Sequence, residues 1–157
     1  MTRLTVLAMA AIGMGLAIVL MASPTAAHQA AAAPAEPRPE PPPEFTKLCV
    51  RCHPSDKIVE GRRYKTQWDQ VLEQMVARGA TGTDQEFDVV FDYLVSEFGR
   101  VDINKAPADE IAQVLHLEQG VADTIVKQRP FADFDTLSAL PGVPVLELTK
   151  RRDAIVF

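Results

Sequence analysis

The chain has 157 residues, of which 47% are hydrophobic and 24% are charged, so most of it is expected to fold as one or two small domains. The net charge of −5 gives no support for general nucleic-acid binding and no indication of an acidic partner. Aromatic residues make up only 6% of the chain, which fits a small helical protein, and we expect an all-α fold.

The first 27 residues have the pattern of a targeting segment. Arg3 gives a short positive start, residues 4–22 form an uninterrupted apolar run, and residues 23–27 offer mostly small side chains for cleavage. We therefore predict a secretory signal peptide over residues 1–27. The alternative is an uncleaved membrane anchor, because the run approaches the length of about 20 residues that spans a bilayer. Both interpretations place the folded part in the periplasm.

Residues 28–43 are expected to be a linker. An alanine tract is followed by prolines that alternate with Glu and Arg, and such prolines favour an extended polyproline conformation over a helix. This stretch is a semi-rigid spacer without a core of its own, and it would hold the next domain away from the membrane if the apolar run were retained. His28 lies in it and is not expected to bind a metal.

The most specific pattern is Cys49-Val50-Arg51-Cys52-His53, a C-x-x-C-H sequence that contains both cysteines of the chain. This spacing is typical of c-type haem attachment. Two thiols on one helical turn can form thioethers with the two vinyl groups of one porphyrin, and His53 then lies under the iron as its proximal ligand. The sequence therefore predicts one covalent haem c, held by Cys49 and Cys52.

Two other chemistries use a C-x-x-C pair. A zinc site needs further Cys or His ligands, and the remaining histidines, His28 and His116, lie far away in the sequence. A thiol–disulfide redox motif normally lies near a βαβ pattern, and the surrounding sequence lacks this pattern. Haem attachment is therefore the favoured interpretation.

A first domain is predicted over residues 44–99. A segment this short buries little core on its own, so a covalent haem would form much of its interior. A basic cluster lies at Arg62, Arg63 and Lys65. Apolar spacing and caps predict three helices, namely a short one that ends at the attachment motif, one from Thr66 or Gln67 to Arg78, and one from Thr83, with a capping box through Glu86, to a stop at Gly99.

Met75 is predicted to be the second axial ligand of the iron. Its thioether is a soft, neutral ligand that raises the reduction potential of haem. All other methionines lie in the targeting segment, and His116 belongs to the next domain. A methionine on an apolar helical stripe with Trp68, Val71, Leu72 and Val76 is usually a core residue, so this prediction depends on ligand type and elimination.

Residues Phe45–Gly99 resemble a small class I cytochrome c domain. The resemblance rests on Cys49–His53, on the spacing of Trp68 and Met75 followed by Gly79-Ala80, and on Tyr93-Leu94 in the last helix. The arrangement is similar to the haem domains of quinohaemoprotein dehydrogenases and to haem subunits of sulfite dehydrogenases. The resemblance implies an exposed haem edge for electron transfer. Since no polar distal group is evident, an electron carrier is favoured over an enzyme.

A second domain is predicted over residues 100–157 as two helix-hairpin-helix units. Pro107 is expected early in a helix over Ala108–Leu115, and Gly120 is expected to break the chain before a helix over Val121–Gln128. The second unit is expected to contain a short helix through Leu140 capped by Asp133 or Asp135, a tight turn over Leu140–Pro144, and a closing helix over Val145–Ile155.

This domain resembles the tandem helix-hairpin-helix module of competence DNA-uptake proteins, the ComEA-like family. The matching residues are Ile103-Asn104, Ala106, Glu110-Ile111, Ala122, Ile125-Val126, Arg129, Phe131, Leu137, Leu140–Val143 and Ile155. The resemblance implies that paired glycines of each hairpin present backbone N–H groups to a DNA phosphate. Here Gly142 remains, but His116, Glu118 and Pro144 replace the other three glycines. Proline has no N–H to donate.

The charge of the second domain also argues against DNA. Residues 100–157 contain nine acidic and seven basic residues, and only Lys150-Arg151-Arg152 forms a local basic cluster. Duplex binding depends on neutralising many phosphates, so this composition favours a docking or structural role.

Two functions from different classes follow from these patterns. The first is a periplasmic electron carrier whose second domain docks it on an oxidoreductase or a membrane complex. The alternative is a haem-containing DNA-binding or DNA-uptake protein, and a haem sensor stays open as a third interpretation. No nucleophile with a base and no paired carboxylates in a motif are evident, so an enzyme is not expected. Membrane contact is expected only if residues 4–22 are retained.

Overall fold

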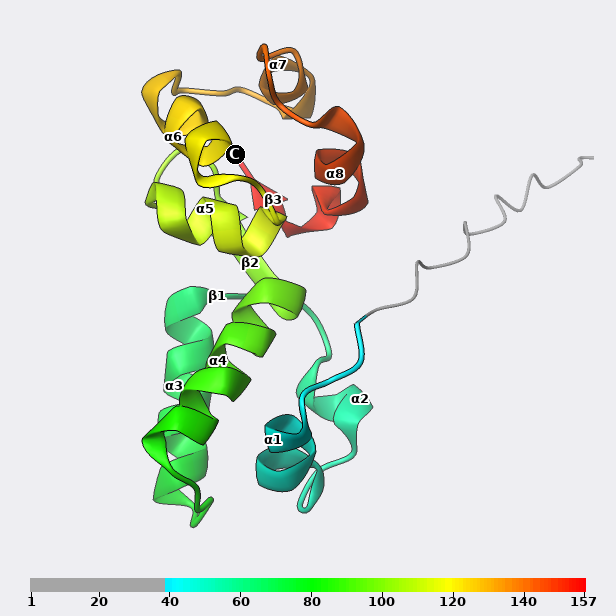
Figure 1. Ribbon diagram of the computed structural model, residues 1–157, viewed down its shortest axis with the longest axis vertical. Coiled ribbons are helices and arrows are strands. Elements are labelled where there is room, and N and C mark those ends of the chain that lie inside the picture. Colours follow the sequence, from blue (N-terminus) through cyan, green and yellow to red (C-terminus); the bar gives the residue numbers. More distant parts are fainter. Residues whose placement is uncertain (1–38) are drawn as a thin grey trace, which may run out of the picture. The chain divides into compact units, whose positions relative to one another are not determined.

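The structure is a computed structural model, and it describes residues 39–157. They belong to one compact unit that extends from Pro37 to Phe157 (Figure 1). The predicted signal peptide or anchor and the predicted linker up to residue 38 lie outside the described residues. Between residues 39 and 157, no helix is long and apolar enough to cross a membrane.

Helices make up most of the described chain. In order they are α1 Pro43–Phe45, the π-helix η1 Thr46–Val50, α2 Ser55–Ile58, α3 Lys65–Ala77, α4 Asp84–Phe98, α5 Ala108–Leu115, α6 Gln119–Lys127, α7 Phe134–Ser138, α8 Val145–Lys150 and the 3-10 helix η2 Arg152–Ala154. The strands are β1 Arg63–Tyr64, β2 Gly99–Asp102 and β3 Ile155–Val156. The prediction of a mainly helical fold is confirmed, but an all-α fold is wrong because these strands pair.

The strands form a small parallel sheet in the order β1-β2-β3. On one side of β2, Gly99 pairs with Arg63, and on the other side Val101 pairs with Ile155. The N–H of Ile103 extends this pairing with a hydrogen bond of 2.8 Å to the carbonyl oxygen of Val156. Strand β2 therefore joins the segment before α3 to the C-terminal end of the chain.

Side-chain hydrogen bonds cap the N-terminal ends of α3 and α4. Helix α3 begins after Tyr64, whose N–H donates to Gln67 Oε1 at 3.0 Å. At the start of α4, the Thr83 hydroxyl accepts from the Glu86 N–H at 3.3 Å, and Glu86 Oε2 accepts from the Thr83 N–H at 3.0 Å. The predicted capping box is therefore confirmed. Helices α3 and α4 pack side by side (Figure 1).

Helices α5 and α6 follow the predicted order with one difference. Helix α5 has the predicted bounds, with Pro107 immediately before it. Helix α6 starts at Gln119, so Gly120 lies in its first turn and does not break the chain as expected. Glycine is tolerated there because the first turn of a helix needs fewer intrahelical hydrogen bonds.

The last helices are shorter than predicted. Asp133 caps α7, since its Oδ1 accepts from the Thr136 N–H at 2.8 Å, but α7 ends at Ser138. Helix α8 ends at Lys150 and not at Ile155. The chain turns through η2 instead, which places β3 beside β2. Pairing with a distant strand thus decides where the closing helix stops.

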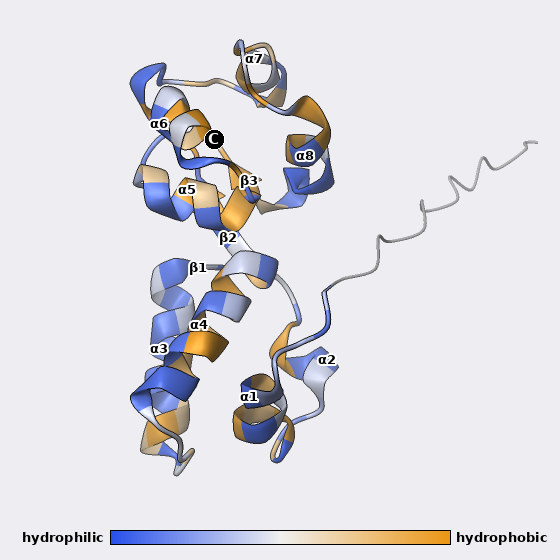
Figure 2. Cartoon of the chain, viewed as in Figure 1, coloured by the Kyte–Doolittle hydropathy of each residue, from blue (hydrophilic) through white to orange (hydrophobic). Residues whose placement is uncertain are grey.

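The core of the described chain is entirely apolar. None of its buried residues is polar or charged, and all of its buried hydrophobic residues belong to one cluster. Its largest fully buried side chains include Trp68, Leu94, Ile111 and Leu148. Figure 2 shows hydrophobic residues on helices of both halves. Residues 44–99 and 100–157 therefore contribute to a common core, and the boundary between them as domains stays a prediction.

Candidate functional site

The two cysteines lie on one turn at the end of the first helical segment. Cys49 belongs to η1, and its carbonyl oxygen accepts hydrogen bonds from the N–H groups of Cys52 at 3.3 Å and His53 at 3.2 Å. Both thiols are free, and Cys49 is half-buried while Cys52 and His53 are exposed. Burial raises the pKa of the Cys49 thiol, unlike the lowered pKa of the reactive cysteine in a redox C-x-x-C motif.

A cavity of about 500 Å³ opens beside this turn. All four predicted site residues line it, namely Cys49, Cys52, His53 and Met75. Its walls contain the apolar side chains of Leu48, Ile58, Trp68, Val71, Leu72 and Leu94. This volume and lining are typical of a cofactor site. The fold therefore brings the attachment motif and Met75 of α3 to one place.

Met75 has different surroundings from its helical neighbours. It lines the cavity and is half-buried, but among residues 39–157 it is not one of the hydrophobic side chains packed against the core. Val71 and Leu72 pack against that core. After α3, the Ala80 N–H donates to the Met75 carbonyl oxygen at 2.9 Å, and the turn formed by residues 78–80 lines the same cavity. These surroundings suit a ligand better than a packing residue.

Every charged side chain that lines the cavity is basic. The set comprises Lys47, Arg51, Lys57, Arg63 and Arg78. Lys47 forms an ion pair with Glu86, and Lys57 lies 3.7 Å from Glu60. Within residues 39–157, the three arginines form no ion pair, so their charges are not neutralised by the protein.

Arg63 and Trp68 form one wall of the cavity. Trp68 is fully buried, and its Nε1–H donates to the Phe98 carbonyl oxygen at 3.1 Å. The Arg63 guanidinium lies 4.7 Å from the centre of the Trp68 ring, which is a cation–π contact. Because the indole is fixed by Phe98, it holds the half-buried guanidinium in place beside the cavity.

This lining fits a haem. A haem has an apolar macrocycle and two propionate carboxylates, which match the apolar walls and the unpaired arginines. The two thiols, the imidazole and the thioether are the ligand types that covalent attachment and axial coordination need. Residues 39–157 contain no group of three or more His, Cys, Asp or Glu side chains that could hold a metal ion.

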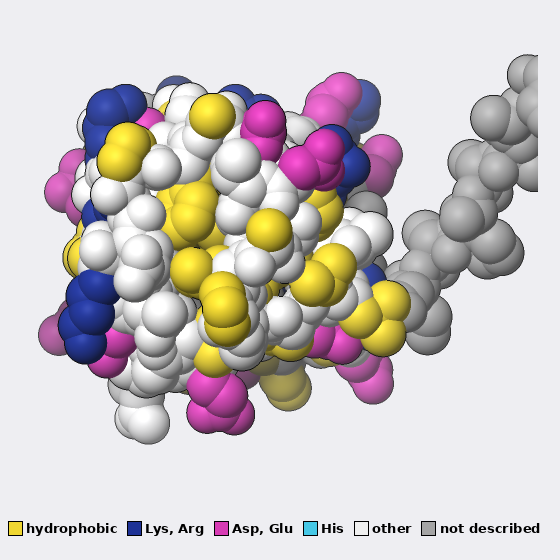
Figure 3. Space-filling view, turned by 90° about the horizontal axis from the view of Figure 1, so that it is seen from above, with side chains coloured by type: hydrophobic (Ala, Val, Ile, Leu, Met, Phe, Trp, Pro, Cys, Tyr) yellow, Lys and Arg dark blue, Asp and Glu magenta, His cyan; other side chains and the backbone are white. Residues whose placement is uncertain are grey.

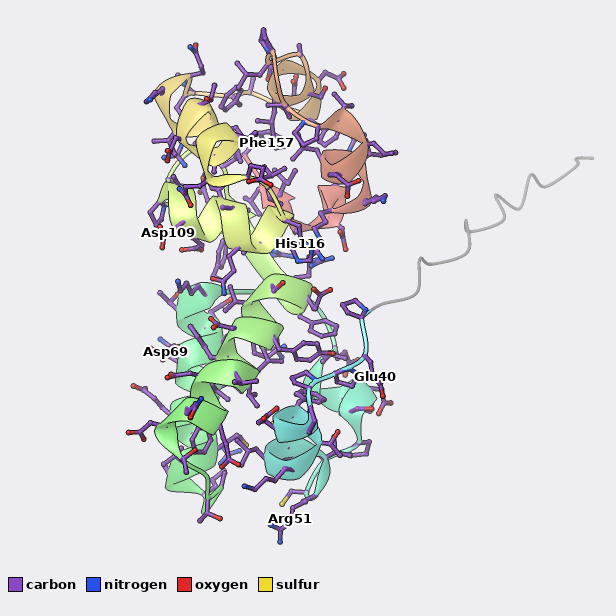
Figure 4. All side chains as sticks on the ribbon, in the orientation of Figure 1. Glu40, Arg51, Asp69, Asp109, His116 and Phe157 are labelled. Atoms are coloured by element: carbon purple, nitrogen blue, oxygen red, sulfur yellow. The ribbon has the colours of Figure 1, made fainter. Side chains whose placement is uncertain are left out.

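A second polar cluster joins the end of α4 to the C-terminal half. Arg151 Nη2 donates to His116 Nδ1 at 2.8 Å and to Glu97 Oε2 at 3.2 Å. His116 Nε2 lies 2.6 Å from Ser96 Oγ (Figure 4 labels His116). Three segments that are distant in the sequence create this cluster, so no sequence spacing pointed to it.

The pairing of Ser96 with His116 does not form a nucleophile and base. Arginine only donates hydrogen bonds, so Nδ1 of neutral His116 is the acceptor and Nε2 carries the proton. This tautomer donates to Ser96 and cannot take the proton of its hydroxyl. Burial, followed by the charge of Arg151, lowers the pKa of His116 below its usual 6.5. The cluster therefore has a structural role.

A hollow of about 560 Å³ lies between two turns of the C-terminal half. Both turns contain a left-handed residue, His116 with φ 54° and Gly142 with φ 85°. The charged side chains that line the hollow include Glu118 and Glu147 and no Lys or Arg. On the face of this half seen in Figure 3, Lys and Arg side chains are scattered among Asp and Glu side chains and form no single patch.

No protein-family model matches this chain, and neither a curated protein nor a solved structure matches it. Its function is therefore argued from the chemistry of the site.

Proposed function

We propose that this protein is a c-type cytochrome of the periplasm that carries single electrons through one covalent haem. The observation that carries the proposal is the meeting of Cys49, Cys52, His53 and Met75 around one cavity of about 500 Å³. Met75 was predicted from ligand type and elimination, without any local spacing that ties it to the attachment motif. Its position in the same cavity supports the complete ligand set.

Each of these residues has one task in the proposal. Cys49 and Cys52 hold the haem through thioethers, and His53 and Met75 supply the two axial ligands. When bound, the haem supplies a one-electron couple at its iron. Two protein ligands leave no axial position for a substrate, so the site favours electron transfer over catalysis.

The remaining lining of the cavity sets the surroundings of this couple. Trp68 and Leu94 are buried and exclude water from the inner wall. An apolar wall disfavours the more highly charged oxidised state, and so it favours a higher reduction potential. Arg63, held on the Trp68 ring, supplies a positive charge for a carboxylate of the cofactor.

The C-terminal half is proposed to hold a protein partner, an oxidoreductase or a membrane complex. Two apolar side chains of α8 support this role, because Val145 is 46% exposed and Leu146 is 69% exposed. The alternative proposal is a haem-containing DNA-binding or DNA-uptake protein. Glu118 and Glu147 at the hollow favour the first proposal, since they repel phosphates. Duplex affinity of the haem-loaded protein at moderate salt separates the two.

Isosteric replacement of the thiols tests the proposal. The wild-type protein, produced with a haem-attachment system, is expected to keep its haem absorbance after denaturation and removal of small molecules. The double variant Cys49→Ser/Cys52→Ser is expected to lose all haem under the same treatment, because only the sulfur atoms that form thioethers are changed. A wild-type protein without covalent haem would refute the proposal.

A further inference from the structure

We infer that the rim of the haem cavity is a docking surface for an acidic redox protein. This inference rests on the proposed function and names the kind of partner that would exchange electrons there. The net charge of −5 gave no indication of an acidic partner, but it averages over the whole chain. The local charge at the cavity has the opposite sign.

The exposed side chains of the rim carry this local charge. Lys47, Arg51, Lys57 and Arg78 line the cavity and are exposed, whereas no Asp or Glu lines it. Figure 4 shows Arg51 projecting from the outer end of the turn after η1. Arg51 and Arg78 form no ion pair with any residue of the described chain. Their charges therefore project into solvent around the opening.

Nearby carboxylates neutralise part of the positive charge at the rim. Exposed ion pairs to Glu86 and Glu60 reduce the contributions of Lys47 and Lys57. The half-buried Arg63 is held against Trp68 and is the guanidinium best placed for the cofactor. Arg51 and Arg78 stay outside both arrangements. They come from two different elements, one from the attachment motif and the other from the end of α3.

Two exposed apolar side chains lie within two residues of these cations in the chain. Val50 is 37% exposed beside Arg51. Val76 is 51% exposed and lies two residues before Arg78, although its place on the apolar stripe of α3 predicted a buried side chain. Apolar contacts within a charged polar rim are the usual composition of a transient protein interface. Cations at the rim would steer an acidic partner to the place where the haem edge lies.

Small redox probes of opposite charge test this inference with the full haem-loaded protein. The reduced protein is mixed with hexacyanoferrate(III), a polyanion, or with tris(phenanthroline)cobalt(III), a polycation. One electron leaves the protein, which is oxidised, and enters the probe, which is reduced, with no bond or proton transferred. We expect the rate with the anion to fall several-fold between about 0.01 and 0.5 M ionic strength, and the rate with the cation to rise.

Charge reversal locates the effect. Lys57→Glu/Arg78→Glu, which leaves the attachment motif intact, should lower the rate with hexacyanoferrate(III) several-fold at about 0.1 M ionic strength, where the Debye length is about 10 Å. Lys127→Glu/Arg152→Glu is the control with the same change of net charge, because both residues are exposed in the C-terminal half and do not line the cavity. It should change the rate at that ionic strength by less than a factor of about 2, because salt screens charges beyond a Debye length.

Three results would overturn the inference. The first is a rate with hexacyanoferrate(III) that rises with ionic strength, as the net charge alone would give. The second is an equal effect of Lys57→Glu/Arg78→Glu and of Lys127→Glu/Arg152→Glu. Rim-dependent binding to anionic lipid vesicles, without any rim effect on the probe rates, would also overturn it in favour of a membrane surface. Failure of the proposed function is distinguished beforehand, since it appears as a lack of covalent haem in every variant.

Discussion

At the scale of single residues, two neighbours on α3 have different roles. Met75 lines the cavity, whereas Val76 is 51% exposed to solvent. Helical geometry turns successive side chains by about 100°. One position therefore separates a side chain that can reach the iron from one that cannot, and this pair offers a matched test of ligation.

Met75→Ala is expected to lower the reduction potential and to remove the weak near-infrared sulfur-to-iron band of the oxidised protein. The physical reason is that a thioether ligand favours ferrous iron. Redox titration and absorbance spectroscopy measure both effects. Val76→Ala removes a similar aliphatic side chain from the same turn and should leave potential and band unchanged. A band that persists in Met75→Ala would show that another group is the sixth ligand.

His116 is the other residue whose conformation and chemistry are linked. Its φ of 54° is left-handed, a conformation that costs a non-glycine residue about 1–2 kcal/mol. The hydrogen bonds of its ring with Arg151 and Ser96 offset this cost. Protonation of Nδ1 would break the hydrogen bond with Arg151. The charge state of His116 is therefore coupled to the polar cluster at the C-terminal end of α4.

Protonation of His116 is expected to lower the stability of the protein as the pH falls. The folded-state pKa of His116 lies below its usual 6.5, so the unfolded chain binds the proton more tightly. The contribution of His116 is complete above the unfolded pKa and is lost as pH falls from about 6.5 through the lower folded pKa. Denaturant unfolding at several pH values between about 7.5 and 5 measures it. Charged groups facing the ring are Glu97, Arg151 and Glu147.

The control variant for this pH effect is His116→Asn. Asparagine tolerates the left-handed conformation and does not titrate, so the variant should lose less stability than the wild type over the same pH range. Equal pH slopes in both proteins would mean that carboxylates alone produce the acid sensitivity, and the role assigned to His116 would be wrong.

At the scale of elements, the C-terminal end of α4 is the point where the chain is held together. Its last carbonyl oxygens accept hydrogen bonds from side chains of three other segments. Arg151 donates to Ser96, Arg62 to Glu97 and Gly99, and Trp68 to Phe98. Two guanidinium groups at a helix C-terminus also interact favourably with the helix dipole. Helix α4 is thus fixed by both halves of the described chain.

Arg151→Met is expected to destabilise the protein by about 3 kcal/mol, because it leaves the nearly buried Glu97 carboxylate without its arginine partner. The Glu97 side chain is only 9% exposed, and the Ser96 and Val114 carbonyl oxygens lose their donor as well. Thermal and denaturant unfolding measure the loss. Arg152→Met, which removes an exposed cation–π contact with Phe134, should cost less than about 1 kcal/mol. Adding Glu97→Gln to Arg151→Met should recover part of the loss.

Gly99 is needed at the junction of α4 and β2 because Val95 and Val114 leave no room for a side chain there. Its backbone angles do not require glycine. Its φ of −71° suits any residue, but a Cβ atom would lie 2.0 Å from the Val95 carbonyl oxygen and 2.9 Å from Val114 Cγ2. Gly99→Ala should therefore cost about 1–3 kcal/mol. Gly120→Ala is the control, since nothing lies within 4 Å of its added Cβ in α6. Equal unfolding midpoints for the two variants would contradict this account.

Local signals predicted the elements, and long-range contacts decided what the sequence did not show. The Thr83 cap and the bounds of α5 depend on residues a few positions apart, so they were predictable. The paired strands β1 and β3 are two residues long, and no alternating pattern exists at that length. The basic cluster of Arg62, Arg63 and Lys65 is evident in the sequence, but only Arg63 of that cluster lines the cavity, whereas Arg62 binds the end of α4. That division depends on tertiary contacts alone.

At the scale of the whole described molecule, the sequence predicted two domains, and the contacts connect them. Strand β2 pairs with β1 on one side and with β3 on the other. The buried side chains of both segments form one cluster. Arg62 of the first segment also pairs with Asp153 of the second at 2.8 Å. These connections leave no weakly bound linker between residues 44–99 and 100–157, so we expect them to unfold as one cooperative unit.

Leu148→Ala tests this cooperativity, because Leu148 lies in the second segment and the haem ligands lie in the first. The fully buried leucine should cost about 2–5 kcal/mol on truncation. If the unit is cooperative, haem absorbance and far-UV circular dichroism should shift to the same lower midpoint. Leu146→Ala, at a side chain that is 69% exposed, should leave both midpoints near the wild-type value. A haem-absorbance midpoint that stays unchanged in Leu148→Ala, while the helical signal falls earlier, would establish two independent domains.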